Sequence, residues 1–387
     1  MNTAATRLAS IDVFRALTMF LMIFVNDLWT LTDIPRWLLH TEAQEDGMGL
    51  SDVVFPAFLF IVGLSIPLAI GGRLRKGQSR GLIMEHILLR SLALLVMGFF
   101  HVNLEAYSSA AFLPKPVWQI LITVCFFLIW LDYPKSMSTG RKWFLQGLGI
   151  FALIFMAMLY SGGDGTQWME PGWWGILGLI GWSYLIGATI FLFSKNRQLL
   201  LLASLIFFLL FNIAANAVWL SFLDPVKKYV WIVGDGSMPA LVMAGVLAAG
   251  LQAENRQLFG KLLLAAVVFI ALGFLLRPYW GISKILATPS WVMICTGISL
   301  IVFAVLTWLV DRKSKAHWFG IIRPAGTSTL TAYLLPYIHY AAYTLIGISL
   351  PLFLRTGVVG IIKSLLYALI IIIITGLLEK IRLRLKI

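Results

Sequence analysis

The chain has 387 residues, of which 60% are hydrophobic and only 12% are charged. Soluble domains carry roughly 25% charged residues, so this composition excludes an ordinary soluble protein. The net charge of +13 comes from basic residues spread over short loops, a pattern that argues against a nucleic-acid partner. We therefore expect an all-α, polytopic integral membrane protein in contact with the lipid bilayer.

Apolar segments, each separated from the next by polar residues, recur along the whole chain. Most are about 18 to 22 residues long, which is enough for a helix to cross ~30 Å of hydrocarbon. The expected helices cover residues 9–29, 52–71, 83–103, 117–132, 143–160, 174–193, 198–220, 237–251, 260–276, 290–310, 327–349 and 357–378. About 11 to 12 of them are expected to span the membrane. The least regular are 237–251, which is short, and 327–349, where Pro336 should kink or break the helix.

The distribution of Lys and Arg over alternate loops predicts the orientation. One side carries Arg7, Arg73, Arg75, Lys76, Arg80, Lys135, Arg141, Lys142, Lys195, Arg197, Arg256, Lys261, Arg312, Lys313, Lys315, Arg323, Lys380, Arg382, Arg384 and Lys386. The other side carries Arg36, Lys115, Lys227, Lys228, Arg277, Lys284 and Arg355. Because cytoplasmic loops are enriched in basic residues, both termini are expected in the cytoplasm, with loops 30–51 and 161–173 outside.

Motifs of soluble enzymes are absent from the sequence. There is no GxxxxGK phosphate loop, no HExxH and no GxSxG. Cys125 and Cys295 lie in separate apolar segments, so no disulfide framework and no metal site is expected. The first apolar segment lacks a signal-peptidase site and is expected to be a retained helix. We expect one transmembrane domain, 1–387, with no soluble domain before or after it.

The first expected helix carries polar residues along one face. Asp12, Arg15 and Asn26 fall within about 60° of one another, and roughly 16 Å of helix rise separates Arg15 from Asn26. An ionisable group at the bilayer centre costs about 2.5 to 3.5 kcal/mol, which makes such a stripe a candidate ligand path. In the alternative interpretation, Asp12 and Arg15 pair as an anchor at the inner interface, and Asn26 bonds to a neighbouring helix.

The third expected helix repeats this spacing. His86, Arg90 and His101 share one face, and Asn103 and Glu105 follow at its outer end. Together the two helices are compatible with a polar path that holds an anion at its inner end. An equally weighted alternative is that His86 and Arg90 extend to the interface while His101 bonds to another helix.

His40 is the titratable residue of most interest. It lies in an outer loop with Glu42, Glu45 and Asp46, shortly before Asp52 at the start of the next helix. An imidazole with a carboxylate partner is the usual general base near neutral pH. A single loop histidine more often has no such role, so the residues alone leave both interpretations open.

The stretch from Arg7 to Pro67 resembles the N-terminal core of the transmembrane acyltransferases typified by heparan-alpha-glucosaminide N-acetyltransferase. The matching residues are Arg7, Ser10, Asp12, Phe14, Arg15, Val25, Asn26, His40, Gly49, Leu50, Asp52, Val54, Phe55, Pro56, Phe58, Phe60, Ile61 and Gly63. Weaker similarities include Arg90, Gln119 and Lys284. The sequence departs from the family pattern at Ala16 and over residues 41–49, which are longer and more acidic.

The resemblance implies a membrane enzyme that moves an acetyl or other acyl group from cytoplasmic acetyl-CoA to a sugar at the outer face, on an amine or a hydroxyl. By position, it implies His40 and Asn26 as catalytic residues. Asp52 and Asp12 are expected to orient groups or hold the acceptor. The acyl-CoA-binding residues are expected to be Arg15, Arg90, Gln119 and Lys284.

A bacterial cytoplasmic (inner) membrane is the expected location, because the loops are short, and a homo-oligomer is compatible with the sequence. A different class of function also fits part of the sequence. About twelve helices and the basic loop at residues 71–81 resemble a secondary transporter of a small solute such as a sugar. That loop lacks the acidic residue expected in such transporters.

Overall fold

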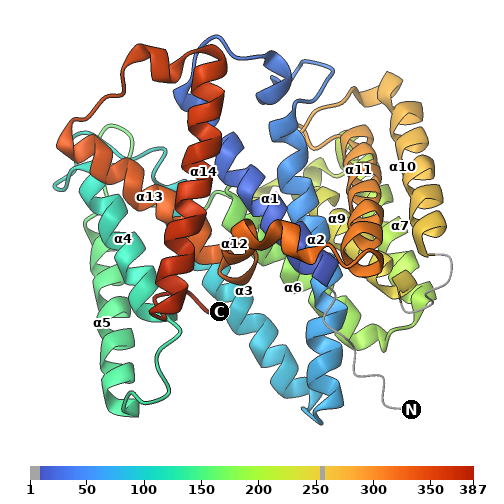
Figure 1. The fold of residues 1–387 in the computed structure, drawn as a ribbon, viewed down its shortest axis with the longest axis horizontal. Coiled ribbons are helices and arrows are strands. Elements are labelled where there is room, and N and C mark those ends of the chain that lie inside the picture. The colour runs from blue at the N-terminus through green and yellow to red at the C-terminus, as the bar shows by residue number, and fades with distance from the viewer. Residues whose placement is uncertain (1–8, 253–257) are drawn as a thin grey trace. The chain divides into compact units, whose positions relative to one another are not determined.

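The computed structural model describes residues 9–252 and 258–387, and this part of the chain is built from helices (Figure 1). The α-helices are α1 (Ala9–Asp27), α2 (Leu50–Arg75), α3 (Arg80–Val102), α4 (Lys115–Trp130), α5 (Thr139–Met158), α6 (Ile176–Ser194), α7 (Gln198–Asn216), α8 (Asp224–Lys227), α9 (Ser237–Gln252), α10 (Leu258–Trp280), α11 (Pro289–Leu306), α12 (Arg323–Thr327), α13 (Thr329–Ile346) and α14 (Gly357–Lys380). Within the described ranges β-structure is limited to isolated bridges, such as Thr32 with Thr356.

Each segment expected to span the membrane coincides with an α-helix. Among the described residues, 9 helices are long and apolar enough to cross a membrane, and α4 and α9 are shorter apolar helices. The prediction of an all-α, polytopic membrane protein is confirmed. The helix does not break at Pro336, because α13 continues through it, and a kink at this proline stays a prediction. The orientation of the termini stays a prediction, and Arg7 and Arg256, which were used for it, lie outside the described residues.

The chain forms two compact units. Of the described residues, the first unit takes those within Met1–Thr18, Pro35–Leu94 and Leu179–Gly320, and the second takes Met19–Ile34, Leu95–Gly178 and Ile321–Ile387. The division falls within α1, α3 and α6. Asp12 and Arg15 therefore belong to the first unit, whereas Asn26 belongs to the second. That the two units act as one domain stays a prediction.

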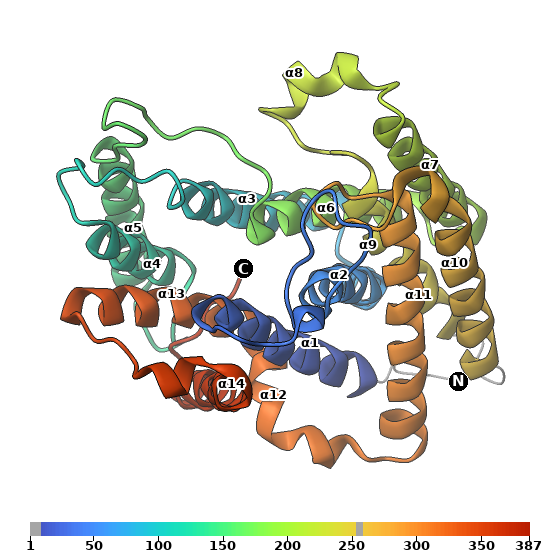
Figure 2. The ribbon, with the colours of Figure 1, turned by 90° about the horizontal axis from the view of Figure 1, so that it is seen from above.

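In the first unit, α2 packs closely against α9, and α10 lies beside α11 (Figures 1 and 2). A Cβ atom on Gly63 would approach the Val242 carbonyl oxygen to 2.0 Å, and one on Gly245 would approach the Phe60 oxygen to 2.0 Å. These two glycines let the backbones of α2 and α9 touch. Such contacts stabilise helix pairs in lipid, where packing takes the place of the hydrophobic effect.

In the second unit, α4 packs against α5 and α13, and α14 packs against α12 and α13. A buried carboxylate joins three of its elements. Asp27, only 2% exposed, accepts hydrogen bonds from Lys363 Nζ and Ser364 Oγ, each at 2.6 Å. The Tyr340 hydroxyl donates to its other oxygen. The end of α1 is thereby fixed to α13 and α14.

Candidate active site around His40

The start of α2 fixes the Asp52 carboxylate. Asp52 lies in the first turn of the helix and is fully buried. Its Oδ2 accepts hydrogen bonds from the main-chain N–H groups of Gly49, at 2.9 Å, and Thr41, at 3.1 Å. A Cβ atom on Gly49 would lie 1.9 Å from the Leu39 carbonyl oxygen, so only glycine fits before this helix. The Gly-Leu-x-Asp pattern in the sequence thus builds a rigid acceptor.

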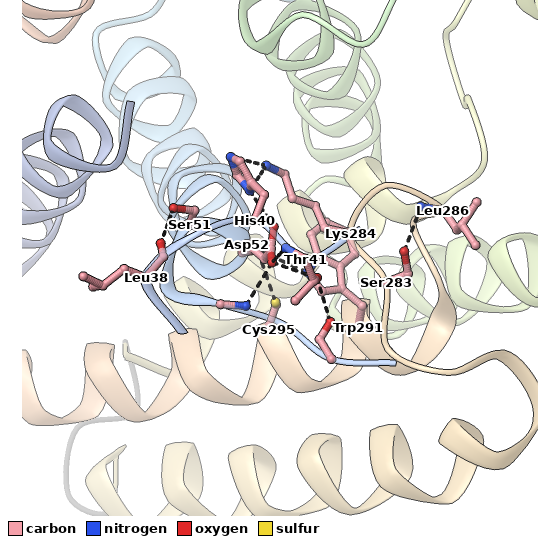
Figure 3. A network of polar contacts seen from close by, with 12 residues as sticks. Leu38, His40, Thr41, Ser51, Asp52, Ser283, Lys284, Leu286, Trp291 and Cys295 are labelled. Carbon is pink, nitrogen blue, oxygen red and sulfur yellow. Dashed lines mark hydrogen bonds and ion pairs between the residues drawn. The ribbon is translucent and has the colours of Figure 1, made fainter. Parts of the chain in front are cut away.

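His40 uses the remaining oxygen of this carboxylate. Its Nδ1 lies 2.6 Å from Asp52 Oδ1, and 49% of the His40 side chain is exposed (Figure 3). Because a carboxylate only accepts hydrogen bonds, a neutral imidazole in this position carries its proton on Nδ1. The lone pair on Nε2 is then able to take a proton from another molecule.

The main chain around Asp52 is also fixed by hydrogen bonds from side chains. Trp291 Nε1 on α11 donates to the Asp52 carbonyl oxygen at 3.1 Å, and Ser51 Oγ donates to the Leu38 oxygen at 2.6 Å. Trp291 is fully buried. These bonds join three segments into one rigid support: the loop that carries His40, the start of α2, and α11 (Figure 3).

A lysine from a distant part of the sequence completes the cluster. Lys284, in the loop between α10 and α11, places Nζ 3.2 Å from His40 Nδ1 and 3.5 Å from Nε2 (Figure 3). Burial lowers the pKa of Lys284, and the negative charge of Asp52 partly offsets this effect. The structure thus places Lys284, expected among the acyl-CoA-binding residues, directly beside His40.

Hydrogen bonds hold two loops of the first unit together, the loop after His40 and the loop that carries Lys284. Arg277 Nε lies 2.9 Å from Asp46 Oδ2, and the Ile282 N–H donates to Asp46 Oδ1 at 2.7 Å. Burial by itself raises the pKa of Asp46, but the hydrogen bonds from Arg277 and Ile282 outweigh it and lower the pKa. Ser283 Oγ adds a bond to the Ala43 oxygen at 2.9 Å. The acidic loop after His40 therefore serves to hold the Lys284 loop.

The other predicted residues of the first unit lie elsewhere in it. Arg15 Nη1 is 3.2 Å from Asp12 Oδ1, and Arg15 Nη2 donates to Ser65 Oγ at 2.7 Å. Ser65 follows Asp52 on α2 by roughly 20 Å of helix rise. Arg90 lies with its guanidinium carbon 4.8 Å from the centre of the Tyr184 ring, and its Nε is buried without a hydrogen-bond partner among the described residues.

Asn26 and Gln119 belong to the second unit, where both line a cavity of about 660 Å³. Gln119 Nε2 donates to the main-chain oxygen of Tyr337 at 2.8 Å. Tyr337, which also lines the cavity, was not singled out from the sequence. The cavity also includes His101, which the sequence had placed on the same face as Arg90.

The sequence did not predict the contacts that several residues make to support the His40 cluster. Thr41, Asp46 and Arg277 hold loops together through contacts between distant positions, and such contacts follow no periodic pattern. Among residues 9–252 and 258–387, no group of three or more His, Cys, Asp or Glu residues is arranged to hold a metal ion.

Comparisons with known proteins find matches for the N-terminal part of the chain. Residues 7–104 match the family model described as heparan-alpha-glucosaminide N-acetyltransferase, catalytic. The heparan-alpha-glucosaminide N-acetyltransferase of Mus musculus is 34% identical over 102 residues, and that of Homo sapiens is 35% identical over 97 residues. The matches cover 26% and 25% of this chain but only 15% and 14% of the two relatives.

The matched range contains His40, Asp52, Asn26 and the first three helices. It includes the glycine and aspartate that shape the start of α2. The resemblance inferred from the sequence motif is confirmed, and the N-terminal part of this membrane protein is related to the catalytic region of the heparan-alpha-glucosaminide N-acetyltransferase family.

Proposed function

We propose that this protein is a membrane acetyltransferase that moves an acetyl group from acetyl-CoA to an amine or hydroxyl group of a sugar. The observation that carries the proposal is the pairing of half-exposed His40 with the fully buried Asp52 at 2.6 Å. The similarity of residues 7–104 to an acetyltransferase catalytic region supplies the reaction class.

His40 acts as the general base in this proposal. Its Nε2 takes the proton from the attacking amine or hydroxyl as the new bond to the acetyl carbon forms. Asp52 holds the imidazole in the required tautomer and stabilises the imidazolium that results. The carboxylate is suited to this role because its second oxygen already accepts two main-chain N–H groups, which prevents it from rotating.

Lys284 is assigned to the acyl end of the donor. Its amine lies 3.2 Å from His40 Nδ1, inside the cluster assigned to the reaction. The same amine can stabilise negative charge on the thioester oxygen or on the departing thiolate. Asn26 is assigned as a second donor to the thioester oxygen, as the resemblance implies.

The nucleotide end of the donor is assigned to Arg15 and Arg90. Guanidinium groups suit phosphate oxygens, and Arg15 contacts α2 roughly 20 Å along the helix from Asp52. A pantetheine arm is of the same order of length. Gln119 is assigned to acyl-CoA binding, as the resemblance implies. With the expected orientation, acetyl-CoA enters from the cytoplasm and the acceptor from the outer face of a bacterial cytoplasmic membrane.

The proposal is tested by incubating purified protein with acetyl-CoA labelled in the acetyl group and a panel of amino sugars and neutral sugars. We expect label to appear in a sugar product, and its position on nitrogen or oxygen identifies the acceptor group. Absence of transfer to every sugar, under conditions where CoA binds, contradicts the proposal.

A second assay separates this function from a solute transporter. A donor site requires that CoA protect the protein against thermal unfolding, whereas a transporter of small sugars has no reason to bind CoA. We expect a higher Tm in the presence of CoA and no such change with adenine alone. An unchanged Tm with CoA favours the transporter.

A further inference from the structure

The second unit contains a cavity that differs in chemistry from the His40 cluster. Its volume of about 660 Å³ falls within the usual range for small-molecule sites. Helices α1, α3, α4 and α13, the segments next to them and the segment before α6 contribute its polar and aromatic lining, which includes Asn26, Trp29, His101, Glu105, Gln119, Trp174, Tyr337 and Tyr340. Every residue that lines it belongs to the second unit.

His101 lines this cavity with unused hydrogen-bonding capacity. The residue is only 8% exposed, and neither Nδ1 nor Nε2 has a hydrogen-bond partner in the described part of the chain. Its ring stacks on Tyr337, with centroids 4.1 Å apart and planes inclined by 15°. Buried polar groups are nearly always satisfied, so two unsatisfied atoms on one side chain point to a missing partner.

The chemistry of that partner follows from the imidazole. A neutral histidine presents one N–H donor and one acceptor nitrogen. Hydroxyl groups both donate and accept, so adjacent hydroxyls on one molecule satisfy both nitrogens.

The remaining lining indicates an uncharged, ring-shaped ligand. Trp29 and Trp174 are 74% and 62% exposed, and Trp29 meets Tyr340 edge-on with centroids 5.9 Å apart. Flat aromatic faces suit the C–H face of a sugar ring, whose rim carries the hydroxyls. Glu105 and Lys115 contribute one charge of each sign, and the Glu105 carboxylate also accepts from Trp174 Nε1 at 3.1 Å.

We propose that the second-unit cavity binds a neutral polyhydroxylated ring of sugar size and that His101 recognises it through both ring nitrogens. This inference goes beyond the proposed function, because it does not depend on acetyl transfer. His101 becomes a specificity-determining residue that distinguishes a sugar from an apolar ring of equal size. The two exposed tryptophans provide the stacking surface.

Calorimetric titration of detergent-solubilised full-length protein with methyl β-D-glucopyranoside, without acetyl-CoA, tests this site. Cyclohexanol, a six-membered ring with one hydroxyl, is the comparison ligand. We expect His101→Phe, which keeps an aromatic ring against Tyr337, to weaken binding of the glucoside about tenfold, as loss of two neutral hydrogen bonds requires. His101→Gln, which restores a donor and an acceptor, should recover part of the affinity.

His86→Phe is the matched control, because His86 lies on the same helix but does not line the cavity. It should bind the glucoside as the wild type does. If His101→Phe fails to fold, His101→Leu serves as the second variant without ring nitrogens. Equal affinity of the wild type and the folded His101 variants overturns the inference, as does a wild type that binds cyclohexanol as tightly as the glucoside or does not bind the glucoside.

The result is separable from the test of acetyl transfer. Binding that depends on His101 in a protein without transferase activity leaves the sugar site standing and removes the proposed reaction. Acetyl transfer in a protein whose glucoside binding does not change when His101 is replaced overturns the sugar site and leaves the proposed reaction standing.

Discussion

Two buried carboxylates, one in each unit, show how similar local structures serve different purposes. Asp52 in the first unit and Asp27 in the second are 0% and 2% exposed, and each accepts hydrogen bonds at both oxygens. Asp52 directs one oxygen to His40, a half-exposed imidazole. Asp27 directs both oxygens to Lys363, Ser364 and Tyr340 within its own unit.

The difference lies in what the partner can reach. A carboxylate that orients a half-exposed imidazole prepares its free nitrogen to take a proton from a bound molecule and stabilises the imidazolium that forms, which suits catalysis. A buried carboxylate paired with a largely buried ammonium neutralises a charge that would otherwise be costly in a membrane helix, which suits a structural role. Changes at the first site should therefore reduce activity, and changes at the second should reduce stability.

The largest expected effect is on acetyl transfer after His40→Ala. A positioned general base contributes on the order of 10² to 10⁴ in rate, so the variant should lose nearly all transfer while its Tm and CoA affinity stay close to those of the wild type. Initial rates with labelled acetyl-CoA measure this. His317→Ala, at an exposed histidine of the same unit, is the control and should keep full activity. Transfer by His40→Ala above about a tenth of the wild-type rate contradicts the assignment.

Asp27→Asn should have the largest effect on stability. It leaves the largely buried Lys363 ammonium, whose side chain is 18% exposed and which lies 2.6 Å from the carboxylate in the native protein, without an anion. Breaking a buried ion pair in this way costs about 3 to 5 kcal/mol, so thermal unfolding in detergent should show a clear fall in Tm. Asp33→Asn, at an exposed position in the same unit, should leave the Tm unchanged. Equal Tm values for the two variants would remove the contrast between Asp27 and Asp52.

Asn26→Ala tests the residue beside Asp27 for a role in chemistry. If its amide stabilises negative charge on the thioester oxygen, kcat should fall by roughly 10² with little change in donor affinity. Steady-state kinetics separate this from a binding role, because an unchanged kcat with a raised KM identifies a residue that contacts the ground state only. A matching fall in Tm would instead group Asn26 with the structural role of Asp27.

The smallest expected effects concern the nucleotide end of the donor. Arg15→Ala or Arg90→Ala should weaken CoA binding by about 1.5 to 3 kcal/mol, the scale of a charge-assisted hydrogen bond. The affinity for a short pantetheine thioester, which lacks the nucleotide, should barely change. Arg15 also pairs with Asp12 and Ser65, the arrangement expected of an anchor. Equal losses for both ligands in calorimetric titrations assign the arginines to structure and overturn their donor role.

The sequence predicts much of the fold because hydropathy is a local property. Each expected helix is present, and the i,i+3 spacing of Asp12 and Arg15 already predicts their contact. The motif around Gly49 and Asp52 also has a local cause, because both residues shape one helix end.

The contacts that define the candidate sites are not local, which is why the sequence misses them. Lys284 reaches His40 across 244 positions, through a loop that the Asp46–Arg277 pair holds across 231 positions. The sequence shows that His101 is polar on a helix face, but only the packed structure shows that its nitrogens have no partner among the described residues. The same holds for Asp27, whose partners come from α13 and α14.

A double-mutant cycle between His40 and Asp52, read as kcat/KM for acetyl transfer, tests the central claim most directly. If Asp52 acts by orienting His40, Asp52→Asn should slow the wild-type protein by about 10 to 10², and should cause no further loss in the His40→Ala background. The two variants then share one coupled function. An Asp52→Asn loss of equal size in both backgrounds would show that Asp52 acts independently of His40, and would contradict the account.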